Sequence, residues 1–196
     1  MHAHDARRYA RAHLALRAIL GSYLGCEPAA LRFGAHPQGK PCLVYPHTAL
    51  RFNLSHSKDR ALLAVGVADE IGVDLEAVRD DLPGAELAAA VLCAEELAEL
   101  AQFAPAAQAL PFVACWARKE ACLKALGLGL HLDPRGLHVG LQAHRMDVRI
   151  DGRDLELVSL PTAPGHCAAV ASLGGLGRIE AFEFESPVAP DGTSRD

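Results

Sequence analysis

Hydrophobic residues recur at helical spacing in three stretches of the chain. In residues 6–25, apolar side chains lie three or four positions apart with arginines between them, which predicts an amphipathic helix. Residues 84–103 are rich in Ala, Leu and Glu and predict a second helical stretch, with a break near Cys93. Residues 110–126 predict a third helix, which Gly127 ends because glycine readily adopts the left-handed conformation of a helix C-cap.

Shorter apolar stretches predict strands before and after these helices. Residues 50–54 and 61–67 have strand character and flank the polar run 55–59. Residues 71–76 alternate apolar and acidic side chains, as a strand with two different faces does. Residues 36–41, with the sequence HPQGKP, predict a turn. Further strands are expected toward the C-terminus at 137–141, 146–150, 155–160, 168–173 and 179–184.

The order of these elements predicts an α+β protein built from two halves. A helix and strands would form the first half, residues 1–70. Helices and strands would form the second half, residues 71–184. Residues 185–196 have no pattern, and we expect them to form a loose tail.

Composition and charge exclude several classes of protein. With 51% hydrophobic and 22% charged residues, the composition is that of a folded globular protein. Apolar runs stay well short of the ~20 residues of a membrane span, and arginines interrupt the N-terminal apolar positions. We therefore expect neither a membrane segment nor a signal peptide, and a cytoplasmic location. The six cysteines form no Cys-x-x-Cys pair, which argues against a zinc ribbon or a disulfide framework.

The charges are unevenly distributed along the chain. Residues 1–60 carry nine basic and three acidic side chains, a balance of +6. Residues 61–196 carry ten basic and 21 acidic side chains, a balance of −11. This division indicates that one end of the molecule can face an anion and the other a cation.

Two acidic residues on one predicted strand are the first candidate for chemistry. Asp74 and Glu76 lie two residues apart and therefore point to the same face of the strand. Neighbouring carboxylates repel each other unless a cation or water separates them, and Mg²⁺ accepts such oxygen ligands. A solvated polar face on an edge strand has the same pattern, so both interpretations stay open at this point.

Two further segments carry residues suited to phosphate or metal chemistry. Trp116, Glu120 and Lys124 are four residues apart and share one face of the third predicted helix. A surface ion pair beside a core tryptophan explains the same spacing. The polar run 53–57, followed by Lys58, can hold a phosphate between two strands, and an ordinary hairpin turn is the alternative.

Together these segments resemble the Sfp-type 4′-phosphopantetheinyl transferases. Each motif is short, but their order and spacing along most of the chain are specific. The matching segments have the sequences GKP, FNLSHS, IGVDLE and WARKEACLKALGLG, at residues 39–41, 52–57, 71–76 and 116–129.

The resemblance implies an enzyme that transfers the 4′-phosphopantetheine arm of coenzyme A to a serine of an acyl or peptidyl carrier protein, releasing 3′,5′-ADP. It implies two similar α+β halves related by a pseudo-twofold, with coenzyme A bound between them. Because Met1 falls late relative to the family, the first half is expected to lack its N-terminal strands. We expect a monomer without a nucleic-acid or membrane partner. The carriers of fatty-acid, polyketide and peptide synthases all remain candidates.

The same motifs imply the residues of the site, position by position. Asp74, Glu76 and Glu120 correspond to the ligands of a Mg²⁺ or Mn²⁺ ion. Glu120 is also the candidate base for the serine proton, and Lys119 or Lys124 would stabilise the leaving group, with Lys124 counted among the catalytic residues. The positions expected to contact coenzyme A are Arg8, Lys40, Ser55, His56, Lys119 and Lys124, with Arg8 and His56 near its 3′-phosphate.

Two other interpretations accompany the active transferase. One is a truncated relative that binds coenzyme A or a carrier without catalysis, and the other is a metal-dependent phosphoesterase that uses the same three acids. The intact acids and lysines favour the transferase over the first, and the lack of a phosphatase motif disfavours the second. Because carrier proteins are acidic, we expect the basic N-terminal half or Arg118 to contact them, rather than Glu95 and Glu96.

Overall fold

The computed structural model describes residues 3–79, 84–127 and 132–184, with side chains from residue 9 onward. The helices are α1 (Ala3–Leu24), α2 (Ala85–Val91), α3 (Ala94–Leu100) and α4 (Ala109–Leu126). The strands are β1 (Arg32–Ala35), β2 (Pro41–Tyr45), β3 (Leu50–Ser57), β4 (Arg60–Val67), β5 (Glu70–Ala77), β6 (Arg145–Ile150), β7 (Arg153–Leu160) and β8 (His166–Leu173). This is an α+β architecture, as the sequence predicts. None of the described helices is long and apolar enough to cross a lipid bilayer.

The three predicted helical stretches are confirmed. The first is α1, and the third is α4, which ends at Leu126 and is followed by Gly127 with a positive φ of 67°. The predicted break in the second stretch separates α2 from α3. There the backbone N–H of Cys93 donates to the side chain of Glu96, which caps the start of α3. The predicted tail, residues 185–196, lies outside the described residues.

The predicted strands at 71–76, 146–150, 155–160 and 168–173 are confirmed, whereas two others are wrong. Residues 137–141 form no strand, because carboxylates of α3 bind their backbone N–H groups. Oε1 of Glu96 accepts from Val139 at 2.9 Å and from Gly140 at 3.2 Å. Residues 179–184 are exposed and pair with no strand in the described part of the chain. The pattern predicts only the turn at 36–41 and misses the two strands, β1 and β2, that this turn connects.

The polar run 55–59 is mostly strand and not the loop that the pattern predicts. β3 continues as far as Ser57, which pairs with Arg60 at the start of β4. The connection between the two strands is therefore reduced to Lys58 and Asp59, with Lys58 at a positive φ of 54°.

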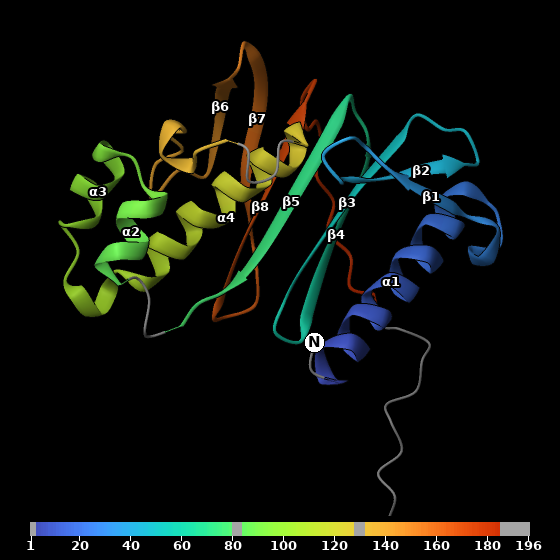
Figure 1. Cartoon of the computed structure of the whole chain (residues 1–196), viewed down its shortest axis with the longest axis horizontal. Coiled ribbons are helices and arrows are strands. Elements are labelled where there is room, and N and C mark those ends of the chain that lie inside the picture. Colours follow the sequence, from blue (N-terminus) through green and yellow to red (C-terminus); the bar gives the residue numbers. More distant parts are fainter. Residues whose placement is uncertain (1–2, 80–83, 128–131, 185–196) are drawn as a thin grey trace, which may run out of the picture.

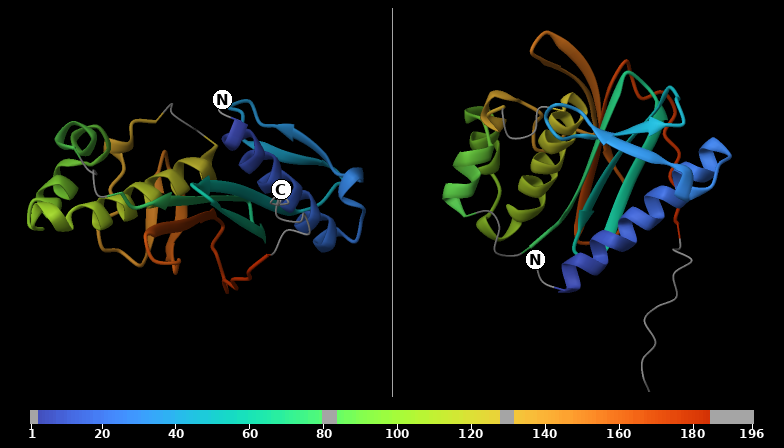
Figure 2. Two further views of the ribbon diagram at one scale, coloured as in Figure 1. Left: turned by 90° about the horizontal axis from the view of Figure 1, so that it is seen from below. Right: turned by 45° about the vertical axis from the view of Figure 1, so that its right-hand side comes forward.

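The strands form three separate sheets. β5, β8, β7 and β6 make a four-stranded antiparallel sheet in this order, and the hairpins β1–β2 and β3–β4 form one two-stranded sheet each. In Figure 1, α4 crosses the four-stranded sheet, α2 and α3 lie beyond α4, and α1 lies at the opposite end of the molecule with β1 and β2. The β3–β4 hairpin lies between these two ends, beside β5 (Figures 1 and 2).

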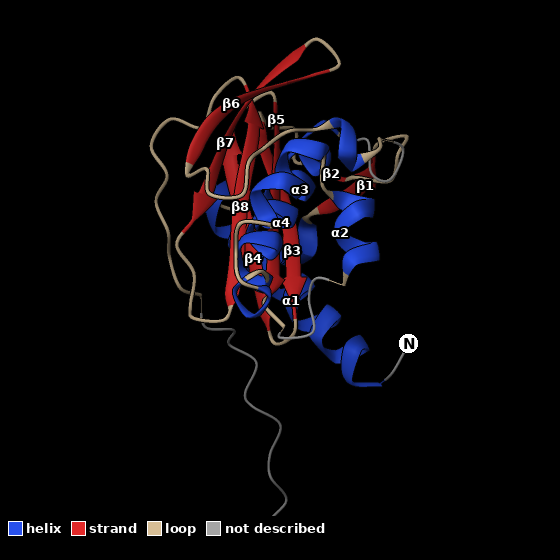
Figure 3. Ribbon diagram, turned by 90° about the vertical axis from the view of Figure 1, so that its left-hand side faces the viewer, coloured by secondary structure: helices blue, strands red, loops and turns tan. Residues whose placement is uncertain are grey.

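The close contact between α4 and β5 depends on Gly72. A Cβ atom at this position would lie 2.2 Å from the carbonyl oxygen of Ala121 and 2.2 Å from the nitrogen of Ala125. Glycine therefore lets the helix backbone rest directly on the strand. Figure 3 shows α4 and the strands from the end of the molecule that carries α2 and α3. Because side chains alternate along a strand, Asp74 and Glu76 lie on the same face as Gly72 and point toward α4.

The β3–β4 hairpin is shared between two packing clusters. Phe52 on one face of β3 packs with Leu20 of α1 in a buried apolar cluster. Leu62 of β4 packs against a second cluster that includes Val73 and Val170 of the four-stranded sheet. The hairpin thus connects α1 to the sheet, and the face of β3 opposite Phe52 is left to face β5 with polar side chains.

Candidate functional site

Asp74 is the centre of a polar group between β3, β5 and α4. Its side chain is only 3% exposed, and its Oδ1 accepts hydrogen bonds from Nζ of Lys124 at 2.5 Å and from Oγ of Ser55 at 2.9 Å. Nζ of Lys124 also donates to Oγ of Ser55 at 3.1 Å. Three residues that the sequence motifs single out separately are therefore joined in one hydrogen-bonded group.

Glu76 and Glu120 are half-buried beside this group. Burial raises the pKa of Glu76, and the negative charge of Asp74 raises it further. Burial and then Asp74 likewise raise the pKa of Glu120. Lys124 lowers both pKa values but does not cancel the rise. The site therefore has an excess of negative charge that a bound cation would relieve.

One oxygen of Asp74 gives independent support for a cation. Oδ2 is buried and has no hydrogen-bond partner among the described residues. Buried polar atoms in folded proteins nearly always have a partner, so such an atom needs an explanation. A set of carboxylate oxygens is the kind of ligand that Mg²⁺ and Mn²⁺ prefer. Asp74, Glu76 and Glu120 therefore offer the type of ligand that such an ion prefers, although in this structure their oxygens do not all lie within 4.8 Å of one another.

A second cluster of potential metal ligands does not fit an ion. Within the described chain, Cys93, Glu96 and His138 form the group of three whose ligand atoms all lie within 4.8 Å of one another. Both oxygens of Glu96 are already occupied, since Oε2 pairs with Nζ of Lys119 at 2.6 Å and Oε1 accepts from the backbone of Val139. A metal there would have to displace a buried ammonium group.

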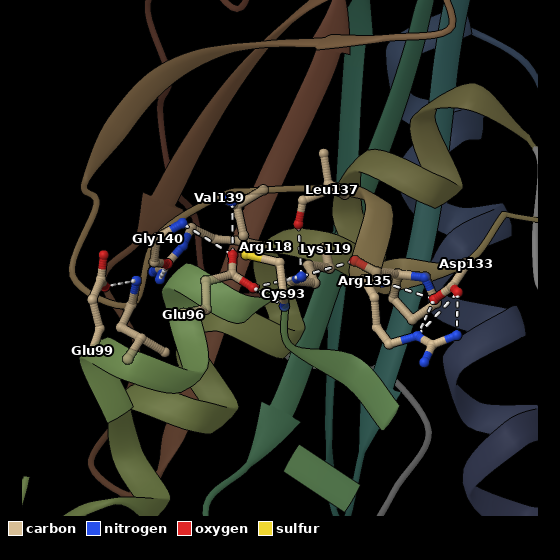
Figure 4. Close-up of polar contacts among 12 residues, drawn as sticks. Cys93, Glu96, Glu99, Arg118, Lys119, Asp133, Arg135, Leu137, Val139 and Gly140 are labelled. Atoms are coloured by element: carbon tan, nitrogen blue, oxygen red, sulfur yellow. Dashed lines mark hydrogen bonds and ion pairs between the residues drawn. The ribbon is translucent and has the colours of Figure 1, made fainter. Parts of the chain in front are cut away.

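Lys119 is placed differently from what the family resemblance implies. Its side chain is 1% exposed, and besides Glu96 it donates to the carbonyl oxygens of Pro134 at 2.8 Å and Leu137 at 2.6 Å (Figure 4). All three hydrogens of its ammonium group are thus used inside the protein. The structure does not bring Lys119 to the carboxylates of β5, because it leaves α4 in a different direction from Glu120.

Arg118 is also buried, so the expectation that it contacts an acidic carrier is wrong for this structure. It is 2% exposed and donates to the carbonyl oxygens of Gly140 and Ala143 and to Oγ of Ser159. Its role is to hold the segment between α4 and β6, and Glu96 is buried in the same region (Figure 4).

Lys40 connects the N-terminal hairpin to the second part of the chain. Its Nζ donates to Oε2 of Glu70 and to the carbonyl oxygen of Ala125 at 3.1 Å. Burial lowers the pKa of Lys40, and Glu70 opposes this effect. A cavity of about 250 Å³ lies beside Lys40, and its lining includes the basic side chains of His36, His47 and Arg51.

His56, another expected coenzyme A contact, is not joined to the Asp74 group. His56 is exposed and, as the neighbour of Ser55 on a strand, points to the opposite face of β3. The side chain of Arg8 lies outside the described residues, and so does the end of the last motif, residues 128–129. Conversely, sequence reasoning missed Ser57, whose Oγ donates to Oε2 of Glu76 at 3.3 Å.

Comparison with known proteins identifies the family. The family model of the 4′-phosphopantetheinyl transferase superfamily matches residues 70–165. The chain is 32% identical over 183 residues to 4′-phosphopantetheinyl transferase HetI of Nostoc sp., an alignment that covers 87% of this chain and 72% of the relative.

Other relatives match over a shorter region. The chain is 40% identical over 114 residues to 4′-phosphopantetheinyl transferase AcpT of Escherichia coli O157:H7, covering 58% of this chain and 56% of that protein. It is 31% identical over 133 residues to a 4′-phosphopantetheinyl transferase of Bacillus subtilis, covering 67% and 57%. The alignments span just over half the length of these two relatives. With the match to HetI, they show that the chain belongs to the 4′-phosphopantetheinyl transferase superfamily.

Proposed function

We propose that this protein transfers the 4′-phosphopantetheine arm of coenzyme A to a serine of an acyl or peptidyl carrier protein and releases 3′,5′-ADP. The observation that carries the proposal is the Asp74 group, where a buried carboxylate with one unpartnered oxygen lies between Lys124 and two half-buried glutamates. The names of the relatives support the same reaction class.

The proposed reaction is a single phosphoryl transfer. The serine Oγ of the carrier attacks the phosphorus that bears the pantetheine arm, a new P–O bond forms, and the bond to the bridging oxygen of the pyrophosphate breaks. The electron pair leaves with 3′,5′-ADP, and the serine proton passes to a base. Catalysis of such a step consists mainly of positioning and charge neutralisation.

In this proposal, Asp74, Glu76 and Glu120 would hold Mg²⁺ or Mn²⁺. When bound, the ion supplies positive charge to the pyrophosphate oxygens. Lys124 is the nearest ammonium group to Asp74 and would stabilise the negative charge that develops on the leaving phosphate. Glu120 would accept the serine proton, directly or through a water molecule.

The nucleotide end of coenzyme A is assigned in this proposal to the N-terminal part of the chain. The lining of the 250 Å³ cavity includes Lys40, His36, His47 and Arg51 and one acidic side chain, Glu70, which pairs with Lys40. Such a lining is suited to phosphate groups, and it lies in the part of the chain with the positive charge balance.

Mass spectrometry of a carrier protein tests the proposal. The protein is incubated with an apo acyl carrier protein, coenzyme A and MgCl₂, and in parallel with EDTA in place of MgCl₂. We expect the carrier to gain the mass of phosphopantetheine only in the presence of the metal. A folded protein that binds coenzyme A but leaves several apo carriers unmodified would instead indicate the non-catalytic relative.

A further inference from the structure

The outer edge of β5 is closed in an unusual way. β8 pairs with β5 along one edge through a regular antiparallel ladder. On the other edge, the backbone N–H groups of Val73, Leu75 and Ala77 point away from β8 and are covered by β3. Buried N–H groups need hydrogen-bond partners, and a neighbouring strand normally supplies them with its backbone carbonyl groups.

Here the partners are side chains of β3. The N–H of Val73 donates to Oδ1 of Asn53 at 2.8 Å. The N–H of Leu75 donates to Oγ of Ser55 at 3.3 Å, and that of Ala77 to Oγ of Ser57 at 3.0 Å. The partners in each bond are 20 residues apart, so the two strands run in the same direction with a constant register.

The two serines of this register also contact the carboxylates of the site. Ser55 donates its hydroxyl proton to Asp74 and accepts from Leu75 and Lys124, so the bonding capacity of the hydroxyl group is complete. Ser57 accepts from Ala77 and donates to Glu76. Each hydroxyl group is therefore fixed by the β5 backbone and in turn orients one carboxylate.

Asn53 provides an internal comparison. It closes the β5 edge at Val73 in the same way as the serines do, but within the described part of the chain it forms no hydrogen bond to an acidic side chain. All three residues alternate on one face of β3, opposite the apolar face that carries Phe52. The edge closure and the orientation of the carboxylates can thus be separated by substitution.

We propose that Ser55 and Ser57 are positioning residues that β3 supplies to the carboxylate site, and that they act on the reaction by orienting Asp74 and Glu76 and not by binding coenzyme A. The proposal rests on the proposed function, because it assigns Asp74 and Glu76 to the metal. The proposal assigns a different role to the two serines of the segment Ser55–Ser57, which face β5, whereas His56 between them faces the opposite side of β3. Residues that orient metal ligands from behind alter metal affinity or activity about 10–100-fold when they are removed.

Three variants, Asn53→Ala, Ser55→Ala and Ser57→Ala, separate these roles. The first readout is amide hydrogen exchange, followed by NMR on the metal-free protein without coenzyme A. We expect Ser55→Ala to accelerate exchange of the Leu75 amide by about tenfold or more, whereas Asn53→Ala acts on Val73 and Ser57→Ala on Ala77. Equal protection of these amides in the wild type and the variants would contradict the register.

The second readout is the affinity for Mn²⁺, measured by electron paramagnetic resonance without coenzyme A. Ser55→Ala should weaken Mn²⁺ binding and lower kcat by about 10–100-fold, with KM for coenzyme A changed less than about twofold. Asn53→Ala should leave Mn²⁺ affinity within about twofold of the wild type. Ser172→Ala, which removes a buried hydroxyl group of β8 bonded to the carbonyl oxygen of Glu70, is the matched serine control and should leave both unchanged.

The outcomes distinguish this inference from the proposed function. If Ser55→Ala raises KM for coenzyme A and keeps wild-type kcat and Mn²⁺ affinity, the serine binds the substrate and the positioning role is refuted. A wild-type protein that binds Mn²⁺ but transfers nothing refutes the proposed function, while the Mn²⁺ affinities of the variants still decide the role of the serines. Ser57→Ala, at a half-buried position, provides the same comparison if Ser55→Ala does not fold.

Discussion

Replacing Lys119 by Met tests whether this lysine belongs to the protein core, because Met keeps an extended side chain and removes its charge. In the folded protein the side chain of Lys119 is 1% exposed and that of Glu96 is fully buried, with Nζ 2.6 Å from Oε2. Nζ also donates to the carbonyl oxygens of Pro134 and Leu137. Lys119→Met therefore leaves a buried carboxylate without its cation and removes the lysine donor of two carbonyl groups, of which Pro134 keeps the backbone N–H of Leu137 as a donor.

The expected loss of stability follows from these contacts. Removing one partner of a buried ion pair costs about 3–5 kcal/mol, because the other charge stays buried without compensation. Backbone N–H groups of Cys93, Val139 and Gly140 still bond to Glu96, so we expect the lower end, about 3 kcal/mol. In a protein of this size, that corresponds to a decrease in Tm of about 6–12 °C.

Urea unfolding of the metal-free protein, without coenzyme A, measures this loss. Arg149→Met is the control, because Arg149 and Asp154 form an ion pair with both side chains mostly exposed, and its removal should leave the urea midpoint unchanged. The double variant Glu96→Gln/Lys119→Met should recover part of the loss, since no unpaired charge remains buried. If Lys119→Met unfolds at the wild-type urea concentration and instead raises KM for coenzyme A, the buried-pair reasoning is wrong.

Three further predictions use the same stability measurement. Burial alone would raise the pKa of Glu96, but hydrogen bonds from Lys119 and from backbone N–H groups outweigh it and lower the pKa from its ordinary value of 4.5. The ionised Glu96 therefore contributes its full stabilisation above pH 4.5, and this stabilisation is lost as the pH falls through the lower pKa of the folded protein. Between about pH 6 and pH 3, the urea midpoint should consequently fall more for the wild type than for Glu96→Gln. Gly72→Ala should destabilise the protein by about 3 kcal/mol or more, because the new Cβ meets the backbone of α4. Gly66→Ala is the control, because its new Cβ would lie 3.9 Å from an Ile71 atom and should displace no helix or strand. Equal urea midpoints for the two variants would refute the close approach of α4 to β5. Glu120→Gln should stabilise the metal-free protein at neutral pH by about 0.5–2 kcal/mol, since it removes a partly buried charge beside Asp74, and a loss of stability would contradict the charge excess of the site.

The local elements of the fold could be predicted because their signals are contained in short stretches. The helical spacing and the terminal Gly127 predict α4, and alternation of apolar and acidic residues predicts β5. The prediction failed at 137–141, where apolar residues resemble a strand but their N–H groups bind Glu96, about 40 residues earlier. Such a distant side-chain partner leaves no trace in a local pattern.

The candidate site was predictable in its acids and less so in its other residues. The spacing of Asp74 and Glu76 correctly places them on one face, and only the structure shows that α4 covers this face, at Gly72 two residues earlier. Lys119 follows the motif by position, but one residue along a helix turns the side chain by about 100°, which separates it from Glu120. Helical geometry could have indicated this.

The role of the serines had a signal in the sequence that points to a strand and not to a loop. Asn53, Ser55 and Ser57 alternate with Leu54 and His56, which is the period of a strand with one polar face. The alternation does not show that β5 is the strand next to this polar face. The 20-residue register between β3 and β5 is a tertiary feature, and it turns three polar side chains into partners of a strand edge.

The central claim is that Asp74 holds the metal that phosphopantetheine transfer requires, and the most direct measurement compares two variants of the full chain. Asp74→Asn and Asp154→Asn make the same chemical change, the first in the buried site and the second at an exposed position of β7. We expect Asp154→Asn to load an apo carrier protein at the wild-type rate with Mg²⁺ and coenzyme A, as judged by the carrier mass. Asp74→Asn should remain folded, lose Mn²⁺ binding and load no carrier. Wild-type transfer by Asp74→Asn would contradict the account.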